Sequence, residues 1–265
     1  MTKTRVCVAG ATGWVGKPLC QAIESAEDLQ LAGAVSRSSS GKPIEEITGL
    51  YGNDLKIAGS VEEALASATD VLVDYTKPDA VKGNVLTAVE KGVHAVIGTS
   101  GLSETDFTDI AEAAKSNGVG VIAAGNFAIT AVLMQRFAAE AAVYLSSFEI
   151  IDYASESKPD APSGTARELA SRLADVRSPV HSVPVEETIG ERDSRGSTLN
   201  GVQVHSIRVP GFVLSTEAVF GAPEERLTIR HDAGSSTEPY IQGTLLAIRR
   251  VKDQTGLVRG LEKIM

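Results

Sequence analysis

Apolar and polar positions alternate in a regular rhythm through the first half of the chain. Five short apolar runs have the length and β-branched content of buried strands. They are Thr4–Ala9, Leu29–Ser36, Asp70–Tyr75, Val93–Ile97 and Gly118–Ala124. Helical patterns separate these runs. Two of them are Trp14–Ala26 and Val61–Ser67, the second of which follows a Ser60/Glu63 capping box. A third begins at Pro78, and a fourth follows a Ser103/Asp106 capping box and ends at about Ser116. This alternation predicts an α/β unit, a parallel sheet with helices on both faces that binds ligands at the carboxyl ends of its strands.

The pattern changes after Asn126. One long helical pattern covers Ile129–Tyr144, a strand-like run follows at Ser147–Tyr153, and a further helix is expected to begin near Ser163. Residues 177–200 are polar and loop-like. Three more strand-like runs and a closing helix then follow, at Val202–Val209, Val213–Phe220, Arg226–His231 and Glu238–Val251. The second half is therefore predicted to be an α+β unit with an antiparallel-rich sheet.

Composition narrows the classes of partner. The net charge of -9 argues against a nucleic acid as the main partner, because phosphate binding needs a basic surface. No apolar run approaches the ~18 residues of a membrane span, and the N-terminus enters a strand-like pattern without signal-peptide features. The two cysteines, Cys7 and Cys20, and the four scattered histidines have no metal-ligand spacing. We expect a cytoplasmic protein without a metal, a membrane or a nucleic-acid partner.

A glycine-rich turn follows the first predicted strand. In VAGATGWVGKPL the glycines Gly10, Gly13 and Gly16 lie between a strand and a helix, which is the context that a dinucleotide fingerprint requires. Glycines permit a tight turn and close approach of the backbone to a pyrophosphate, and the helix N-terminus attracts its charge. The same turn also occurs without a nucleotide, but the complete strand–turn–helix context favours the nucleotide site.

The end of the second predicted strand indicates which nucleotide is bound. An acidic residue there would accept a hydrogen bond from the ribose 2′-hydroxyl of NADH. This chain has Ser36 and Arg37 instead, and a guanidinium pairs well with a 2′-phosphate. We therefore predict NADPH, with NADH as a weaker cofactor. Short-chain dehydrogenases share the glycine spacing, but they need Tyr-x-x-x-Lys on one helical face, and Tyr153 and Lys158 are five residues apart.

A second motif is suited to binding an anion. The run from Lys158 to Ala166, KPDAPSGTA, precedes the helix expected near Ser163. Free backbone N–H groups at a helix start bind carboxylates, and Lys158 adds a positive charge. The alternative is that Asp160 and Ser163 only cap the helix.

Together these motifs resemble the 4-hydroxy-tetrahydrodipicolinate reductase (dihydrodipicolinate reductase) family of lysine biosynthesis. They are Gly10–Gly16, Gly98-Thr99-Ser100-Gly101, Asn126-Phe127-Ala128 and Lys158–Ala166, in that order. The resemblance implies a Rossmann-like nucleotide domain over residues 1–127 plus 238–265, a substrate domain over residues 128–237 that forms a homotetramer through its sheet, and hinge closure between them.

The resemblance also implies site residues. Contacts with the nicotinamide cofactor would fall to Gly10, Ala11, Thr12, Gly13, Trp14, Val15, Ser36, Arg37, Gly98, Thr99, Ser100, Ala124, Gly125, Asn126 and Phe127. A small carboxylate-bearing substrate would contact Lys158, Ser163, Gly164 and Thr165.

The chain departs from the family's pattern around the expected substrate. Where relatives carry a histidine pair, of which the first is the presumed general acid, this sequence has Ala154 and Ser155. No arginine follows His231 at the family's spacing, and Trp14 stands where the family often has a basic residue. A positioned acid contributes ~10²–10⁴-fold in rate, so its loss is not a neutral change.

These departures indicate a changed acceptor. Reduction of the family's conjugated ring needs a carbon to be protonated, whereas a protonated imine accepts hydride directly. We therefore expect an NADPH-dependent reductase acting on a carboxylated cyclic imine or a conjugated C=N/C=C acceptor, with Lys158 as the candidate catalytic residue. Two alternatives stay open: the lysine-pathway reductase itself with a substitute acid, and an inactive NADPH-binding sensor or scaffold.

Overall fold

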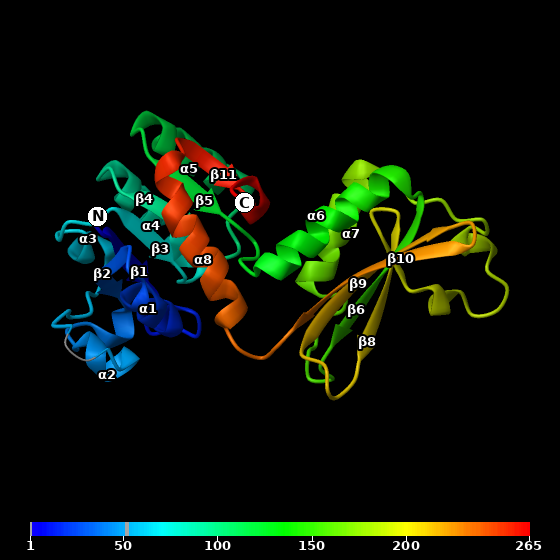
Figure 1. The fold of residues 1–265 in the computed structure, drawn as a ribbon, viewed down its shortest axis with the longest axis horizontal. Helices are drawn as coiled ribbons and strands as arrows, with labels where there is room; N and C mark the ends of the chain where they lie inside the picture. Colours follow the sequence, from blue (N-terminus) through cyan, green and yellow to red (C-terminus); the bar gives the residue numbers. More distant parts are fainter. Residues whose placement is uncertain (1, 51–52) are drawn as a thin grey trace. The chain divides into compact units, whose positions relative to one another are not determined.

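The chain folds into two compact units. The computed structural model describes residues 2–50 and 53–265. The first unit consists of Met1–Ile129 with Thr237–Met265, and the second of Thr130–Ser236. The second unit is therefore an insertion in the first, as the sequence colours of Figure 1 show. Within the described ranges, no helix is both long and apolar enough to cross a bilayer.

A six-stranded sheet forms the centre of the first unit. Its order is β11-β5-β4-β3-β1-β2, and every neighbouring pair is parallel. The strands are β1 (Thr4–Ala9), β2 (Leu29–Val35), β3 (Val71–Asp74), β4 (His94–Ile97), β5 (Gly120–Ala123) and β11 (Gly256–Arg259). Ala9 pairs with Asp74, Asp74 with Ile97 and Ile97 with Ala123, so these four strands end level with one another. The predicted Rossmann-like parallel sheet is confirmed, with β11 as an additional edge strand.

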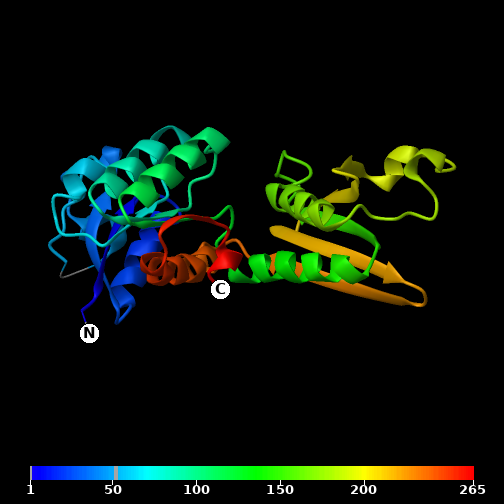
Figure 2. The same cartoon turned by 90° about the horizontal axis from the view of Figure 1, so that it is seen from above.

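Helices cover both faces of this sheet (Figure 2). One side carries α1 (Gly16–Ser25) and α8 (Glu238–Arg250), and the other carries α3 (Val61–Ala64), α4 (Pro78–Glu90) and α5 (Glu104–Ser116). A short helix, α2 (Ile44–Thr48), lies against α1 and was not predicted. Helix α1 begins two residues later than predicted, because residues 10–15 form the turn. The Ser103/Asp106 capping box is present, whereas Glu63 binds the N–H of Gly59 rather than that of Ser60.

The second unit is built on a mixed five-stranded sheet of order β10-β9-β6-β8-β7. Its elements are α6 (Ile129–Tyr144), β6 (Ser147–Ala154), α7 (Gly164–Val176), β7 (Ser197–Leu199), β8 (Val202–Arg208), β9 (Leu214–Ala222) and β10 (Glu225–Ala233). Strands β6 and β8 are parallel and the other pairs are antiparallel. The predicted antiparallel-rich α+β unit is confirmed.

The central strand β6 separates the two faces of the second sheet. Phe148, Ile150, Asp152 and Ala154 are buried, whereas the residues between them are more exposed, as the two-residue period of a strand requires. Helices α6 and α7 pack their apolar side chains on the buried face. Asp152 is therefore a carboxylate on the core side of a strand, an arrangement that needs hydrogen-bond partners.

Candidate active site

The glycine turn between β1 and α1 is tightly closed. Gly10 has φ +85°, and a Cβ on it would lie 2.4 Å from the Tyr75 carbonyl oxygen. A Cβ on Gly16 would lie 2.0 Å from the carbonyl oxygen of Gly10. Both positions exclude any larger residue, and the N–H groups of Gly10 and Ala11 donate to Val35. The turn thus presents backbone to the carboxyl edge of the sheet, as a pyrophosphate site requires.

The end of β2 lies against this turn. The hydroxyl of Thr12 is 2.9 Å from that of Ser36, which in turn is 3.3 Å from the hydroxyl of Ser38. Arg37 opens a short 3-10 turn and is exposed, and within the described part of the chain its guanidinium forms no ion pair. A free cation and hydroxyl groups therefore stand where the sequence predicts recognition of a 2′-phosphate.

The loops after β3, β4 and β5 meet at the same edge. Buried Asp74 accepts hydrogen bonds from Thr76 and from the Thr99 hydroxyl, at 2.7 and 2.8 Å, and so fixes the turn after β4. The Tyr75 ring fills the space beside Gly98, where a Cβ would lie 2.2 Å from its Cε1. Its hydroxyl is 2.7 Å from that of Thr244 on α8, and its ring lies 6.1 Å from that of Phe127 with the two planes tilted by 60°.

All the sequence-predicted cofactor residues belong to the first unit. They lie in four segments that follow β1, β2, β4 and β5, and Val35 at the end of β2 pairs with Ala9 at the end of β1. The segments are Gly10–Val15, Ser36–Arg37, Gly98–Ser100 and Ala124–Phe127. The last segment is ordered locally, because the Asn126 side chain accepts from the N–H of Ala128. Sequence reasoning overlooked Tyr75 and Thr244, which carry no motif; only the fold brings α8 to this edge.

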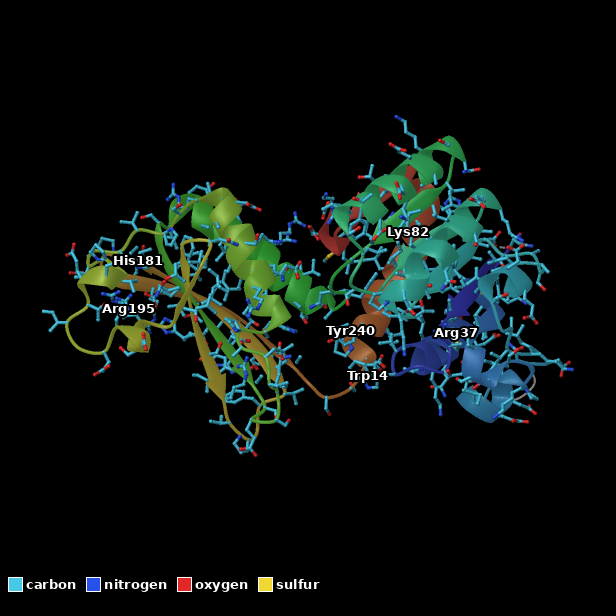
Figure 3. The ribbon with its side chains drawn as sticks, turned by 180° about the vertical axis from the view of Figure 1, so that it is seen from behind. Trp14, Arg37, Lys82, His181, Arg195 and Tyr240 are labelled. Atoms are coloured by element: carbon cyan, nitrogen blue, oxygen red, sulfur yellow. The ribbon has the colours of Figure 1, made fainter. Side chains whose placement is uncertain are left out.

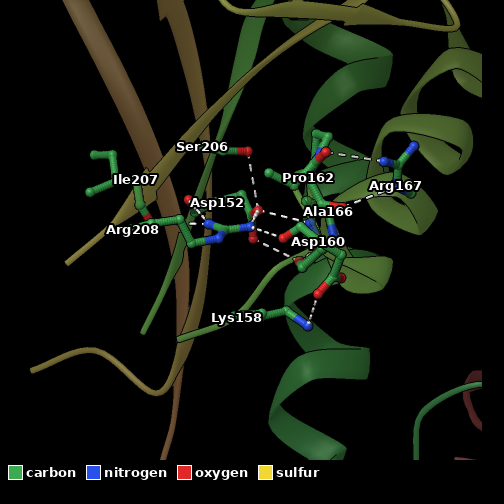
Figure 4. A network of polar contacts seen from close by, with 11 residues as sticks. Asp152, Lys158, Asp160, Pro162, Ala166, Arg167, Ser206, Ile207 and Arg208 are labelled. Atoms are coloured by element: carbon green, nitrogen blue, oxygen red, sulfur yellow. Dashed lines mark hydrogen bonds and ion pairs between the residues drawn. The ribbon is translucent and has the colours of Figure 1, made fainter. Parts of the chain in front are cut away.

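The second candidate region is the loop between β6 and α7 (Figure 4). The carboxylate of Asp152, which is 0% exposed, accepts from the N–H of Ser163 at 2.8 Å and from its hydroxyl at 2.6 Å. Arg208 reaches from β8 and donates to the same carboxylate at 2.7 Å and to the carbonyl oxygen of Asp160 at 2.8 Å. This network fixes both ends of the loop segment that precedes the helix.

The electrostatics of Asp152 follow from these contacts. Burial alone would raise the pKa of this carboxyl, but the hydrogen bonds from Ser163 and the guanidinium of Arg208 outweigh it and hold the pKa below its ordinary value. Asp152 is thus ionised at neutral pH and balances the charge of Arg208. Sequence reasoning overlooked both residues, although an aspartate in the apolar alternation of β6 was a readable signal.

The start of α7 retains free donors. Ser163 caps the helix by accepting from the N–H of Ala166, and its own side chain is 1% exposed. Among the described residues, the N–H groups of Gly164 and Thr165 have no partner. Ser163 therefore caps the helix, whereas Asp160 does not, and the groups that remain available to an anion are the two following N–H groups and the Thr165 hydroxyl.

Lys158 and the residues before it complete this region. Lys158 Nζ lies 2.7 Å from Asp160 Oδ1, and the ammonium hydrogen bond lowers the pKa of that carboxyl. Ala154 is 0% exposed at the end of β6, and the Ser155 hydroxyl is 2.9 Å from that of Ser157. The two positions at which the family resemblance predicts a histidine pair are thus occupied by a methyl group and a hydroxyl.

Comparison with known proteins agrees with this arrangement. The models "Dihydrodipicolinate reductase, N-terminus" and "Dihydrodipicolinate reductase, C-terminus" match residues 4–127 and 130–265. The chain belongs to the dihydrodipicolinate reductase family. A reductase named 4-hydroxy-tetrahydrodipicolinate reductase, from Desulfitobacterium hafniense, is 40% identical and is covered completely, as is this chain. A protein of that name from Thermosynechococcus vestitus is 38% identical over 100% of this chain and 98% of its own.

Solved structures support the same family. The dipicolinate-bound dihydrodipicolinate reductase from Paenisporosarcina sp. TG-14 superposes with a TM-score of 0.90 at 30% identity, over 100% of both chains. GenD2 from gentamicin A biosynthesis, in complex with NAD, reaches a TM-score of 0.66 at 14% identity over 100% of this chain and 90% of its own, which shows a shared fold alone. The family membership confirms an NAD(P)H-dependent oxidoreductase with the expected pair of folds.

Proposed function

We propose that this chain is an NADPH-dependent reductase that transfers hydride to a small carboxylated cyclic imine or to a conjugated C=N/C=C acceptor. The observation that carries the proposal is that an anion site at the start of α7 is kept, while the general acid expected at the end of β6 is missing. Gly164 and Thr165 keep free N–H groups at the start of α7, whereas the buried residue Ala154 cannot donate a proton. The substrate carboxylate is therefore still bound, but the proton transfer made by a histidine is absent.

An imine acceptor fits this combination. A cyclic imine that enters the site protonated is an iminium, which accepts hydride from the nicotinamide and leaves as an amine, so no carbon needs to be protonated. Lys158 carries the one ammonium group in the loop between β6 and α7, and this group forms an ion pair with Asp160 at 2.7 Å. We assign it two roles: it attracts the substrate carboxylate, and it supplies a proton where the acceptor requires one.

Substrate turnover tests this assignment. NADPH oxidation is measured with the lysine-pathway intermediate and with cyclic imine acids, for the wild type and for Lys158→Ala. We expect faster turnover of an imine acid and a ~10²-fold loss in kcat/KM for Lys158→Ala. Lys91→Ala, which removes an exposed lysine paired with Glu62, is the matched control and should leave kcat/KM unchanged for both kinds of acceptor. Turnover of the lysine-pathway intermediate at the rate of histidine-containing relatives would refute the changed acceptor.

Two other functions have specific support. The relatives at about two-fifths identity are named as the lysine-pathway reductase, which favours that reaction with Lys158 as the substitute acid. Loss of the histidine pair favours an NADPH-binding sensor or scaffold without turnover, and tight NADPH binding with no oxidation on any acceptor would select it. The retained donors at Gly164 and Thr165 weigh against the sensor, because a scaffold does not need a carboxylate site.

NADPH is proposed over NADH because of the end of β2. Arg37 is exposed and has no ion-pair partner among the described residues, and the hydroxyls of Ser36 and Ser38 lie beside it. A 2′-phosphate would gain a charge-assisted contact there. Arg37→Ala should raise the KM for NADPH by roughly tenfold and leave the KM for NADH within about twofold. A wild-type preference for NADH would contradict the assignment.

We further propose a cytoplasmic homotetramer assembled through the open face of the second sheet. This face carries Glu149, Ile151 and Tyr153 of β6, and its polar groups are already paired: Glu149 with His205 and Arg195, each at 2.6 Å. Ile207 of β8 is exposed on the same face. Ile207→Lys should reduce the mass measured by light scattering from that of a tetramer. A monomeric wild type would contradict this proposal.

A further inference from the structure

The single tryptophan of the chain lies in the glycine turn and is largely uncovered. Trp14 is 65% exposed, and its ring meets the ring of Tyr240 edge-on, with centroids 5.9 Å apart. Figure 3 shows the two side chains together at the first turn of α8, while Arg37 lies apart from them. Tyr240 thus contacts the indole, and because Trp14 stays 65% exposed beside it, most of the indole surface is available to a ligand.

The position of this pair along the sheet follows from α8. One turn after Tyr240, Thr244 binds the Tyr75 hydroxyl at the end of β3, and the intervening Gly243 packs against the carbonyl oxygen of Phe127, after β5. The first half of α8 therefore lies at the carboxyl edge, on the β3–β5 side of β1. Arg37, at the end of β2, is on the opposite side of β1.

A dinucleotide on a doubly wound sheet straddles the point where the strand order reverses. Here that point is β1, which has β2 on one side and β3 on the other. The 2′-phosphate end belongs with Arg37, so the nicotinamide end belongs on the β3 side. From this we infer that Trp14, supported by Tyr240, is a cofactor-positioning residue whose indole contacts the nicotinamide half of the dinucleotide. The inference rests on the proposed dinucleotide site.

The chemistry of the indole makes this contact specific. A basic residue at position 14 would pair with the pyrophosphate, whereas an indole offers a π-face. The oxidised nicotinamide ring is cationic and the reduced ring is neutral, and tryptophan is the side chain that binds cations best through its ring. Trp14 should therefore favour the oxidised cofactor over the reduced one, a bias that a charged or aliphatic residue cannot provide.

Intrinsic fluorescence tests the contact directly, because Trp14 is the only tryptophan. The protein is titrated with NADP⁺ and with adenosine 2′,5′-bisphosphate, which has the adenosine end alone, and calorimetry measures the binding of each. We expect NADP⁺ to quench the emission at saturation and adenosine 2′,5′-bisphosphate to leave it nearly unchanged. Equal quenching by both ligands, or NADP⁺ binding without a change in emission, would overturn the inference.

Variants separate this role from the folding of the site. Trp14→Leu should weaken NADP⁺ binding by roughly three- to tenfold and NADPH binding by less, with the affinity for adenosine 2′,5′-bisphosphate unchanged. Tyr144→Leu, at an exposed aromatic residue of α6, is the control and should alter none of the three. Equal weakening of NADP⁺ and NADPH by Trp14→Leu would overturn the cation contact. Absence of any binding of NADP⁺ or NADPH by the wild type would instead overturn the proposed dinucleotide site, and the inference with it.

Discussion

Asp152→Asn is the sharpest test of how the second unit is held together. The change removes the charge of a carboxylate that is 0% exposed and leaves Arg208, whose side chain is 16% exposed, without its counter-ion. Breaking one partner of a buried ion pair costs about 3–5 kcal/mol. Arg208 keeps the carbonyl oxygens of Asp152 and Asp160 as acceptors, at 3.2 and 2.8 Å. We therefore expect the lower end, a loss of about 3 kcal/mol in the free energy of unfolding.

The assay is urea unfolding followed by circular dichroism, with Asp28→Asn as the matched control. Asp28 also receives two hydrogen bonds from one arginine, Arg249, but both side chains are about half exposed. An exposed pair contributes about 0–1 kcal/mol, so this variant should unfold close to the wild type. The double variant Asp152→Asn/Arg208→Met should lose less free energy of unfolding than the two single variants lose together, because it removes the unpaired cation. Additive losses would refute a coupled pair.

The pH dependence of Asp152→Asn gives an independent check. The folded pKa of Asp152 lies below the ordinary value of about 3.9, so the stability it provides is present above that pH and is lost as the pH falls through the folded value. The difference between wild type and variant should stay constant from about pH 8 to 5 and shrink below about pH 4. Shrinkage between pH 7 and 5 would show that the carboxyl titrates above its ordinary range and would contradict the lowered pKa.

Two further predictions concern the first unit. Gly243→Ala should destabilise the first unit by about 1–3 kcal/mol, because the new Cβ would lie 1.9 Å from the carbonyl oxygen of Phe127. Gly83→Ala, also inside a helix but with open space around it, should stabilise the unit by about 0.5–1 kcal/mol. Thermal unfolding compares the two variants. Burial lowers the pKa of His94, which accepts from the N–H of Gly120 at 2.9 Å, so stability should fall as the pH drops below about 6.5, and His94→Gln should flatten that slope in urea titrations between about pH 7.5 and 5.5.

Much of the first unit could be predicted because its signals are local. Buried parallel strands read as continuous apolar runs, and the glycine turn must exclude side chains wherever it occurs. The edge strand β11 gave no such signal, since Gly256–Arg259 has only two apolar side chains, Leu257 and Val258, and both are only partly buried. It becomes a strand only because β5 offers it an unpaired edge.

The candidate sites likewise divide into parts with a local sequence signal and parts that depend on the tertiary fold. The candidate backbone segments, the glycine turn at Gly10–Gly16 and the helix start at Gly164–Thr165, carry local motifs and could be predicted from them. The side chains that hold the second site come from residues far apart in sequence: Asp152 and Arg208 are separated by 56 positions and meet because β6 and β8 pair in parallel. That pairing depends on the register of two strands, which no local pattern encodes.

The edge position of β11 also bears on how the protein is made. Gly256–Arg259 pairs with Gly120–Ala123, so the first sheet is completed by residues that leave the ribosome after the inserted unit. All of Thr130–Ser236 is synthesised earlier and contains its own sheet and helices. The inserted unit can therefore fold during translation while the β5 edge of the surrounding unit stays unpaired until β11 is synthesised.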